Sequence, residues 1–483
     1  MNRKMVFNIF GRLITIEGVL LLLPAAVALI YKEFSGALIF LGVAAGAAAL
    51  GLLIRFTVRP DTQVIYAKEG FAVVTLTWVG MSLIGALPFV ISGEIPNFID
   101  AFFETVSGFT TTGASLVTNL PELSHGILFW RSFTHWLGGM GVLVFVMALA
   151  NNISDRTIHI MRAEMPGPVV GKLVPKVRDT AKILYLIYIF LTVSEMVLLC
   201  AGGMSLFEGA IHSFGTAGTG GFSTRPESIG AFSPYIQWVV TAFMLLFGVN
   251  FNLYYLVLIK KFKSAIKSSE LWVYLGIVII STVVMTINIY PVYGTFGESV
   301  RLAAFQSGAI VTTTGYSTAN FDLWPQLSRG LIFVLLFLGG CAGSTAGGLK
   351  ISRSMLLFKL VLREFRQLIR PRSVNRVTMD GKPVDEETLR SVATYFGVYI
   401  ICTAATFLLI CYEPFGLETN LSAAVSCINN VGPGFNAVGP AGGYAGYTAF
   451  SKIVLSVAML LGRLEIFPII IALSPATWVK KAR

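Results

Sequence analysis

Apolar stretches of about twenty residues recur along the whole chain, separated by shorter polar segments. A helix of that length crosses about 30 Å of hydrocarbon. The chain is 55% hydrophobic and only 13% charged, with a mean hydropathy of +0.75. We therefore predict an all-α polytopic membrane protein. The ten predicted spans are 8–31, 36–57, 69–92, 127–150, 181–203, 236–259, 271–291, 330–358, 391–412 and 449–476.

Lysine and arginine are unevenly distributed between the two sides of these spans. With the N-terminus in the cytoplasm, cytoplasmic segments hold 29 of the 36 basic residues and outer segments hold six. This is the positive-inside pattern, so the net charge of +11 needs no nucleic-acid partner. We expect both termini in the cytoplasm and the first span to be retained. The five cysteines form no CxxC motif and indicate neither a disulfide framework nor a zinc site.

After the first two spans, the sequence repeats fourfold with a period of about a hundred residues. Each repeat has a span, an outer segment and a second span. Each outer segment contains a short apolar stretch that leads into a Gly-, Thr- or Asn-rich stretch, at 100–115, 207–224, 298–318 and 419–436. We assign the two N-terminal spans to 1–60 and the four repeats to 61–155, 156–265, 266–375 and 376–483.

Two of the outer segments carry nearly the same string, FTTTGAS at 109–115 and VTTTGYS at 311–317. Aligning all four segments places Gly113, Gly220, Gly315 and Gly432 in register. Each apolar stretch is too short to span, and it fits a half-helix that enters the membrane and turns back. Irregular backbone at membrane depth is tolerated only inside protein or beside water. Four such turns therefore indicate one shared axis.

Such turns have the chemistry of a cation filter. Rings of backbone carbonyls replace the hydration shell of an alkali cation, and glycine adopts the required conformations at little steric cost. Threonine hydroxyls would support the turn, and the half-helices would aim their partly negative C-terminal ends at the ion. The predicted filter residues are Thr110, Thr111, Thr112, Gly113, Ala217, Gly218, Thr219, Gly220, Thr312, Thr313, Thr314, Gly315, Asn429, Asn430, Val431 and Gly432.

The motifs SGFTTTGAS, GTGGFST, VTTTGYST, NNVGPGF, GGCAGSTAGGLK and LLGRLEIFP resemble the Trk/Ktr/HKT superfamily of potassium transporters. The resemblance covers essentially the whole chain and is closest to the TrkH proteins, because of the two extra N-terminal spans. It implies a single-chain counterpart of a tetrameric potassium channel, homodimeric and located in a prokaryotic cytoplasmic membrane. It also implies a cytosolic nucleotide-binding ring, TrkA, which carries the nucleotide. No cofactor is expected on this chain. Four filter glycines go with K⁺ in that family, although two degenerate filters leave the selectivity over Na⁺ open.

Span 330–358 is interrupted by five glycines within 339–348. Each costs up to about 1 kcal/mol in a helix, so we expect a break. The resemblance implies an intramembrane gating loop there. Close packing through small residues is one alternative. A phosphate-binding loop is another, although Leu349 separates the last glycine from the lysine. The expected gate residues are Gly339, Gly340, Gly343, Ser344, Thr345, Gly347, Gly348, Lys350 and Arg463.

Arg463 lies near the middle of the last span, where an arginine costs about 2.5–3.5 kcal/mol. The resemblance implies that it projects into the pore. There it would repel K⁺ by roughly 4 kcal/mol at about 4 Å with an effective dielectric constant near 20. The alternative is a buried ion pair with Glu195. Asn250 and Asn252 face the lower cavity or bond between helices. We expect Glu17 and Glu195 to be packing groups.

These features predict a gated potassium pore without catalytic chemistry. A K⁺/H⁺ or K⁺/Na⁺ symporter on the same fold is the first alternative. A membrane enzyme that uses the glycine-rich stretch is the second, although it lacks a set of acid, base and metal ligands. The cytoplasmic links 151–180, 260–270 and 359–390 are predicted to dock the nucleotide-binding ring.

Overall fold

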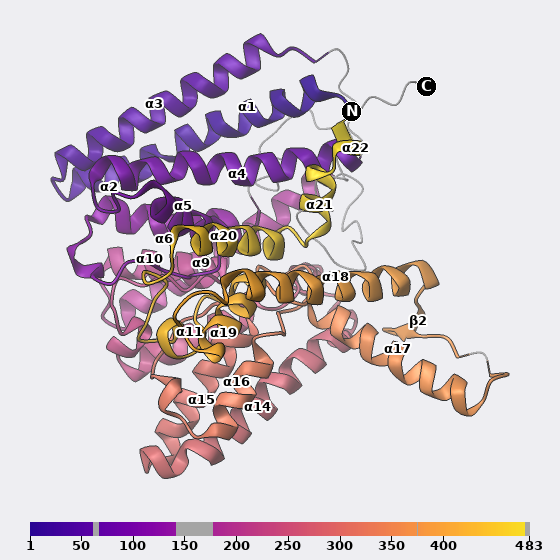
Figure 1. The fold of residues 1–483 in the computed structure, drawn as a ribbon. Helices are drawn as coiled ribbons and strands as arrows, with labels where there is room; N and C mark the ends of the chain where they lie inside the picture. Colours follow the sequence, from indigo (N-terminus) through magenta and orange to yellow (C-terminus); the bar gives the residue numbers. More distant parts are fainter. Residues whose placement is uncertain (61–66, 142–176, 374, 479–483) are drawn as a thin grey trace.

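The computed structural model describes residues 1–60, 67–141, 177–373 and 375–478 (Figure 1). These residues are mostly helical, which confirms the predicted fold class. The one described sheet is a hairpin of β1 (Thr378–Met379) and β2 (Lys382–Pro383). The helices are α1 (Arg3–Leu20), α2 (Leu22–Ile30), α3 (Phe34–Thr57), α4 (Ala67–Ser92), α5 (Phe98–Phe109), α6 (His125–Gly139), α9 (Val177–Ala201), α10 (Leu206–Gly218), α11 (Pro234–Phe247), α12 (Phe251–Leu258), α13 (Phe262–Ile266), α14 (Ser269–Tyr293), α15 (Phe296–Val311), α16 (Gln326–Leu335), α17 (Ile351–Ile369), α18 (Glu386–Ile410), α19 (Leu417–Asn429), α20 (Ala449–Arg463), α21 (Phe467–Leu473) and α22 (Pro475–Trp478).

Six helical segments of the described chain are long and apolar enough to cross a membrane as single spans. Two more cross only as bent pairs, α11 with α12 at 89° and α20 with α21 at 117°. The predicted spans 236–259 and 449–476 are therefore each interrupted by a sharp bend. The predicted span 330–358 divides into α16 and α17, and the predicted span 127–150 is described only to residue 141.

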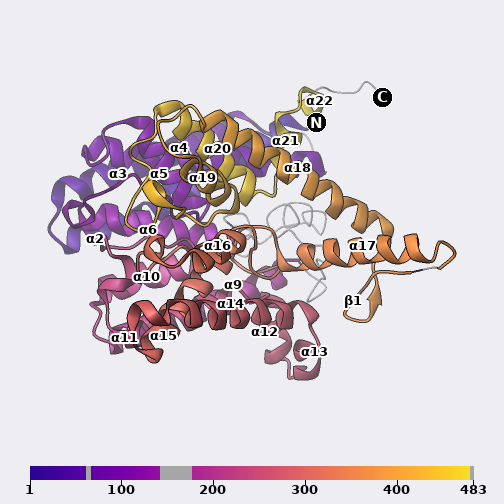
Figure 2. The same cartoon turned by 60° about the horizontal axis from the view of Figure 1, so that its bottom comes forward.

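Each of the four repeats contributes one short pore helix; these are α5, α10, α15 and α19 (Figures 1 and 2). Each packs against the first helix of its own repeat, which is α4, α9, α14 or α18. The second helices α6, α11 and α20 also pack against the pore helix of a neighbouring repeat, which is α10, α15 or α5 respectively. The last of these contacts joins the fourth repeat to the first, so the repeats close around one axis.

The pore helices begin on one face of the molecule, which we call the filter face. At 12–16 residues they are too short to span, and each has an acidic residue in its first turn. Negative charge there favours the partly positive N-terminal end of the helix. Asn97 and Ser205 cap α5 and α10 through their side chains. The C-terminal ends therefore meet inside the protein.

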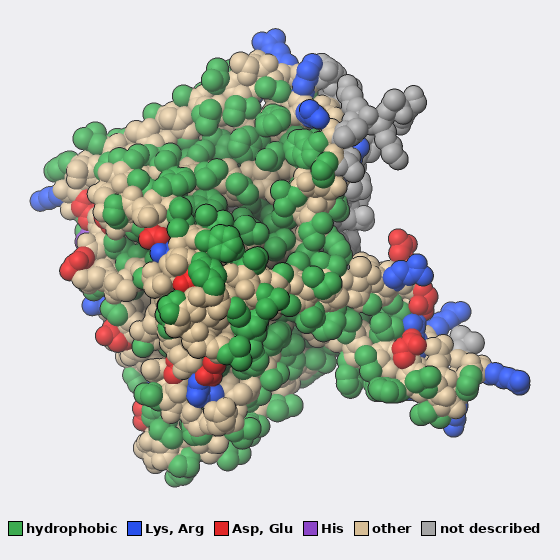
Figure 3. Space-filling model, viewed as in Figure 1, with side chains coloured by type: hydrophobic (Ala, Val, Ile, Leu, Met, Phe, Trp, Pro, Cys, Tyr) green, Lys and Arg blue, Asp and Glu red, His purple; other side chains and the backbone are tan. Residues whose placement is uncertain are grey.

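The N-terminus and α22, the last described helix, lie close together on the opposite face, which we call the gate face (Figure 1). Arg3 Nη2 donates to the Trp478 carbonyl at 2.6 Å across them. Figure 3 shows hydrophobic side chains over most of the surface between the two faces, and a projecting arm with charged side chains formed by α17, β1, β2 and the start of α18. This distribution is that of a protein whose middle band faces lipid.

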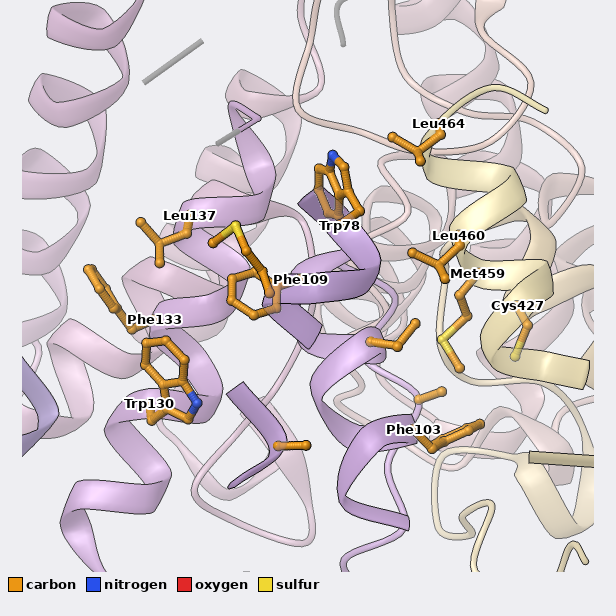
Figure 4. Packing of buried hydrophobic residues seen from close by; sticks show 14 of the residues in the cluster. Trp78, Phe103, Phe109, Trp130, Phe133, Leu137, Cys427, Met459, Leu460 and Leu464 are labelled. Atoms are coloured by element: carbon orange, nitrogen blue, oxygen red, sulfur yellow. The ribbon is translucent and has the colours of Figure 1, made fainter. Parts of the chain in front are cut away.

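An aromatic core holds the first pore helix between repeats one and four (Figure 4). The Phe109 and Trp130 rings form a T-shaped pair with their centroids 6.0 Å apart. The indole N–H of Trp130 donates to the Gly85 carbonyl at 3.0 Å. Met459 and Leu460 of α20 belong to the same buried cluster. This core fixes the depth of α5 and hence of the turn that follows it.

The two N-terminal helices pack tightly through glycines. A Cβ on Gly51 would lie 2.5 Å from the Gly11 carbonyl oxygen, so the backbones of α3 and α1 are in direct contact. Their connecting turn reaches the first repeat, where the Glu33 carboxylate accepts from the backbone N–H groups of His125 and Gly126 at the start of α6. The N-terminal pair is thus attached to the filter face.

Candidate functional site

Each pore helix ends in the same turn. The turn begins with a left-handed residue whose φ lies between 54° and 57°; these are Thr111, Thr219, Thr313 and Asn430. The next residue donates its N–H to the carbonyl five positions earlier, at 2.8–3.0 Å in all four turns. A glycine with positive φ follows; these are Gly113 (77°), Gly221 (76°), Gly315 (74°) and Gly432 (98°). We call the four segments 110–113, 218–221, 312–315 and 429–432 the filter legs.

The second leg corrects the predicted alignment. Gly221, not Gly220, takes the backbone conformation of the other three glycines. Gly220 instead matches Thr112, Thr314 and Val431, because its N–H donates to Gly215 as theirs do to the equivalent carbonyls. The predicted quartet Ala217 to Gly220 therefore moves by one residue, and Ala217 becomes part of α10.

The glycine backbones form a closed ring. Each packs against the carbonyl that precedes the glycine of the next leg, which leaves no room for a side chain. A Cβ on Gly113 would lie 2.0 Å from the Gly220 oxygen, on Gly221 2.0 Å from Thr314, on Gly315 2.0 Å from Val431, and on Gly432 2.5 Å from Thr112. Positive φ and this crowding together require glycine at these positions.

A hollow of about 290 Å³ opens above the ring on the filter face. It is lined by Gly113, Gly221, Gly315 and Gly432, which supports the corrected register. The serine that follows each of the first three legs (Ser115, Ser223 or Ser317) also lines it. The arrangement presents backbone oxygens and hydroxyls around one axis, the ligands that hard monovalent cations prefer.

The legs are supported from behind in three different ways. In legs one and three, the first and third threonines bond to each other, Thr110 with Thr112 at 2.8 Å and Thr312 with Thr314 at 2.7 Å. In leg four, Asn429 replaces the first threonine and donates to the Tyr399 hydroxyl at 2.8 Å. The TTTG string is thus one of several ways to hold the same turn.

Leg two has glycines at both supporting positions, and an imidazole from α6 fills the space. A Cβ on Gly220 would lie 2.4 Å from the His135 ring, and one on Gly218 would lie 2.2 Å from the His135 carbonyl oxygen. His135 is fully buried and stacks on Phe222 at 4.1 Å. A neighbouring repeat therefore supplies the bulk that leg two lacks.

The predicted break in span 330–358 is a loop between α16 and α17 whose two ends lie side by side. Gly339 N–H donates to the Leu349 carbonyl at 2.9 Å, and Ile351 N–H donates to Gly340 at 3.2 Å. The Glu270 carboxylate of α14 accepts from Ala342 N–H at 2.7 Å and from Ser352 N–H at 3.1 Å. The two ends of the loop are thereby pinned together.

The tip of this loop lies directly beneath the filter legs. Thr219 Oγ1 donates to the Thr345 carbonyl at 3.1 Å, and Gly347 N–H donates to Thr313 Oγ1 at 2.6 Å. A Cβ on Gly347 would lie 2.7 Å from the Asn429 carbonyl oxygen. The loop is therefore attached to the second and third legs and touches the fourth.

Arg463 completes the contact with the first leg. Its guanidinium donates to Thr111 Oγ1 at 3.1 Å, to the Thr345 carbonyl at 2.9 Å, and to the carbonyls of Gly138 and Gly139 at 2.5 and 2.7 Å. Glu195, the alternative partner, has no hydrogen bond to either carboxylate oxygen among the described residues. Arg463 therefore joins the first leg, α6 and the loop tip.

Further charged groups surround the gate side of the loop. Lys350 donates to the Ala346 carbonyl within the loop, and Glu465, in the break between α20 and α21, pairs with Arg353 of α17. Lys350, Arg463 and Glu465 line a small cavity of about 40 Å³ below the tip. The break in α20–α21 and the start of α17 are thus linked by charge.

The alternatives for the glycine-rich stretch do not fit this structure. Close packing through small residues needs a continuous helix, but α16 ends at Leu335 and α17 begins at Ile351. A phosphate-binding loop follows a strand, and no strand precedes this loop in the part of the chain described.

Asn250 accepts from Asn252 N–H and caps α12, and its Oδ1 would lie 3.1 Å from a Cβ on Gly343. It therefore faces the loop.

Several residues at the site carried no signal in the sequence. Gly221 was missed because GTGG offers two candidate glycines, and only the backbone conformation distinguishes them. Glu270, His135 and Tyr399 act across repeats or from first helices, far from the motifs. The break at Gly248 to Asn250 had a weak signal, since asparagine is a preferred N-cap.

The fold and the site together define a polytopic membrane transport protein with a central re-entrant pore. The family model described as "TrkH: Cation transport protein" matches residues 39–479, and the chain belongs to this family. The Trk system potassium uptake protein TrkH of Salmonella typhimurium is 34% identical over 99% of this chain and 100% of its own length. TrkG of Escherichia coli K12, also called a Trk system potassium uptake protein, is 34% identical over 98% of both chains. The crystal structure of the potassium transporter TrkH from Vibrio parahaemolyticus superposes with a TM-score of 0.88 at 32% identity, covering 99% of this chain and 100% of that one.

Proposed function

We propose that this protein takes up K⁺ across a prokaryotic cytoplasmic membrane through a channel-like pore, with the filter face outward and both termini in the cytoplasm. The closed ring of four glycines against four carbonyls carries the proposal. A dehydrated cation needs a full shell of oxygens, and such a ring supplies them at a fixed spacing. The homologues named as potassium uptake proteins support K⁺ as the substrate, and they are transporters rather than enzymes.

The proposed gate is the 339–350 loop together with Arg463. Thr345 and Gly347 lie under the legs, and the guanidinium adds a positive charge beside the first leg. This positive charge repels a cation that leaves the filter, and the loop backbone obstructs its path. Conduction then requires the loop to move away from Thr219 and Thr313.

A cytosolic nucleotide-binding ring of the TrkA type is the proposed regulator, and the transporter is proposed to be a homodimer. Two of the predicted docking links form one surface, because Ser269 at the start of α14 donates through its N–H and hydroxyl to Asp380 at 2.8 and 2.6 Å. The charged arm thus connects the 260–270 link to α17, which leads back to the loop. The third docking link, 151–180, lies almost entirely outside the described residues, so it stays a prediction.

Flux into proteoliposomes tests the filter. Gly315→Ser places a side chain against the Val431 carbonyl, so K⁺ flux should fall or its preference over Na⁺ should shift. Gly203→Ser is the matched control, because Gly203 also has positive φ (99°) but nothing within 4 Å of an added Cβ. A Gly315→Ser variant with both K⁺ flux and ion preference unchanged would refute the filter assignment. Reversal potentials at varied pH and Na⁺ separate this pore from the symporter alternative. The reversal potential of a channel follows the gradients of the ions it conducts, weighted by permeability, whereas that of a symporter follows a fixed coupling ratio between K⁺ and the second ion.

A further inference from the structure

The fourth filter leg departs from the symmetry of the other three. The φ of Gly432 is 98°, against 74–77° for Gly113, Gly221 and Gly315. The approach of Gly432 to the next leg is also looser, because its added Cβ would lie 2.5 Å from the neighbouring carbonyl against 2.0 Å at the other three. The backbone contact between legs four and one therefore differs from the other three, although Asn430 Nδ2 of leg four still donates to Thr112 Oγ1 of leg one at 3.0 Å.

A tyrosine hydroxyl lies at this junction. Tyr444 is 2% exposed, and its hydroxyl donates to the Gly432 carbonyl at 2.7 Å. Its backbone N–H donates to the Ser115 carbonyl at 2.9 Å, just beyond leg one. Among the described residues, the carbonyls of Gly113, Gly221 and Gly315 accept no hydrogen bond. Tyr444 thus bonds to the one filter glycine whose geometry differs.

We propose that Tyr444 is a selectivity-determining positioning residue that holds the Gly432 carbonyl and keeps the fourth leg out of fourfold register. The inference rests on the proposed filter function. A carbonyl that accepts a hydroxyl proton has less negative charge left for a cation, and it is also fixed in direction. The four filter glycines then offer three free carbonyls and one shared carbonyl. That arrangement compensates for lost hydration less well and discriminates less between K⁺ and Na⁺.

The phenol ring is held independently of its hydroxyl, which makes the proposal testable. It packs against Phe103 at 5.6 Å and Tyr447 at 5.9 Å. Tyr444→Phe keeps this packing and releases the Gly432 carbonyl. Tyr447→Phe is the matched control, since Tyr447 is a buried neighbour on the same loop whose hydroxyl donates to Asn420 Oδ1 at 2.8 Å and not to the filter.

The experiment measures the K⁺ over Na⁺ permeability ratio from reversal potentials of the purified full-length protein in liposomes, with thermal unfolding as a parallel readout. Tyr444→Phe should raise the ratio several-fold, up to about fivefold, the effect of one hydrogen bond of about 1 kcal/mol. Tyr447→Phe should leave it at the wild-type value. If Tyr444→Phe is not recovered, Tyr444→Leu removes the hydroxyl in the same niche and carries the same expectation.

Three results would overturn the proposal: an unchanged ratio in Tyr444→Phe, a lower ratio, or an equal change in Tyr447→Phe. A merely structural role for the hydroxyl would lower the unfolding temperature without changing the ratio, and that outcome also counts against it. Failure of the filter proposal itself is distinguishable. It would appear as wild-type protein whose reversal potential does not follow the K⁺ gradient, whatever the variants do.

Discussion

Replacing Gly221 by alanine tests the corrected register of the second filter leg. The added Cβ would lie 2.0 Å from the Thr314 carbonyl oxygen, whereas real Cβ atoms are essentially never found below 3.0 Å. Legs two and three must therefore separate by about 1 Å, and the Thr314 carbonyl moves with them. Positive φ adds roughly 1–2 kcal/mol of backbone cost for alanine.

Gly294→Ala isolates the crowding from the backbone cost. Gly294 has nearly the same φ, 73° against 76°, but nothing lies within 4 Å of its added Cβ. Both variants carry the same backbone cost, and Gly221→Ala carries the crowding in addition, so only Gly221→Ala should lose K⁺ flux. We expect a loss of at least about tenfold, which corresponds to about 1.4 kcal/mol.

The assay is potassium-dependent growth of an uptake-deficient host, followed by flux in proteoliposomes at matched protein content. The structure predicts that Gly221→Ala fails to support growth at low K⁺ and that Gly294→Ala supports it. If both variants transported alike, the ring of close backbone contacts would not determine flux. The register would be wrong if Gly221→Ala kept wild-type flux while Gly220→Ala abolished flux and His135→Ala did not restore it.

Three further changes probe the supports and the gate. Gly220→Ala should lower flux, because the added Cβ pushes against the His135 ring. Adding His135→Ala should restore the flux in the same assay. If it does not, His135 is not the side chain that packs behind leg two. Arg463→Gln should raise the flux measured without the partner ring, because it removes a charge-assisted hydrogen bond of about 1.5–3 kcal/mol to the loop tip. Arg329 pairs with Glu418 on the filter face, so Arg329→Gln should leave this flux unchanged. Equal flux in a folded Arg463→Gln variant would contradict the proposed gate. Glu33→Gln should lower the unfolding temperature through a weakened cap of α6 worth about 1 kcal/mol, with flux retained, and an unchanged thermal-unfolding curve would count against that cap.

The sequence was sufficient wherever local pattern and backbone requirement coincide. Gly113 and Gly315 follow identical TTT strings, and both take the expected conformation. The interruption at 339–348 was also predicted, because a run of glycines opposes a helix on its own. The predicted all-α class followed from span length and composition.

The remaining features depend on contacts between distant residues. Apolar runs through 236–259 and 449–476 conceal the breaks at Gly248 and Leu464, because hydropathy does not report backbone direction. Glu270 of α14 holds the 339–350 loop from about seventy residues earlier in the chain. The contacts of Arg463 could not be predicted from the sequence, because apart from the Thr111 hydroxyl the partners described are carbonyls in α6 and the loop tip, which have no side-chain signature.

The different supports behind the four legs have a consequence for how such a pore can be tuned. In an assembly of four identical subunits, one codon change alters all quarters of the ring together, and its effect is applied four times. Here each leg is encoded separately. The side chains that support it are a threonine pair in legs one and three, the His135 imidazole in leg two, and an asparagine–tyrosine pair in leg four. Under the proposed filter function, a single substitution therefore changes one leg in four, which lets selection reach intermediate ion preferences that a ring of four identical subunits cannot adopt.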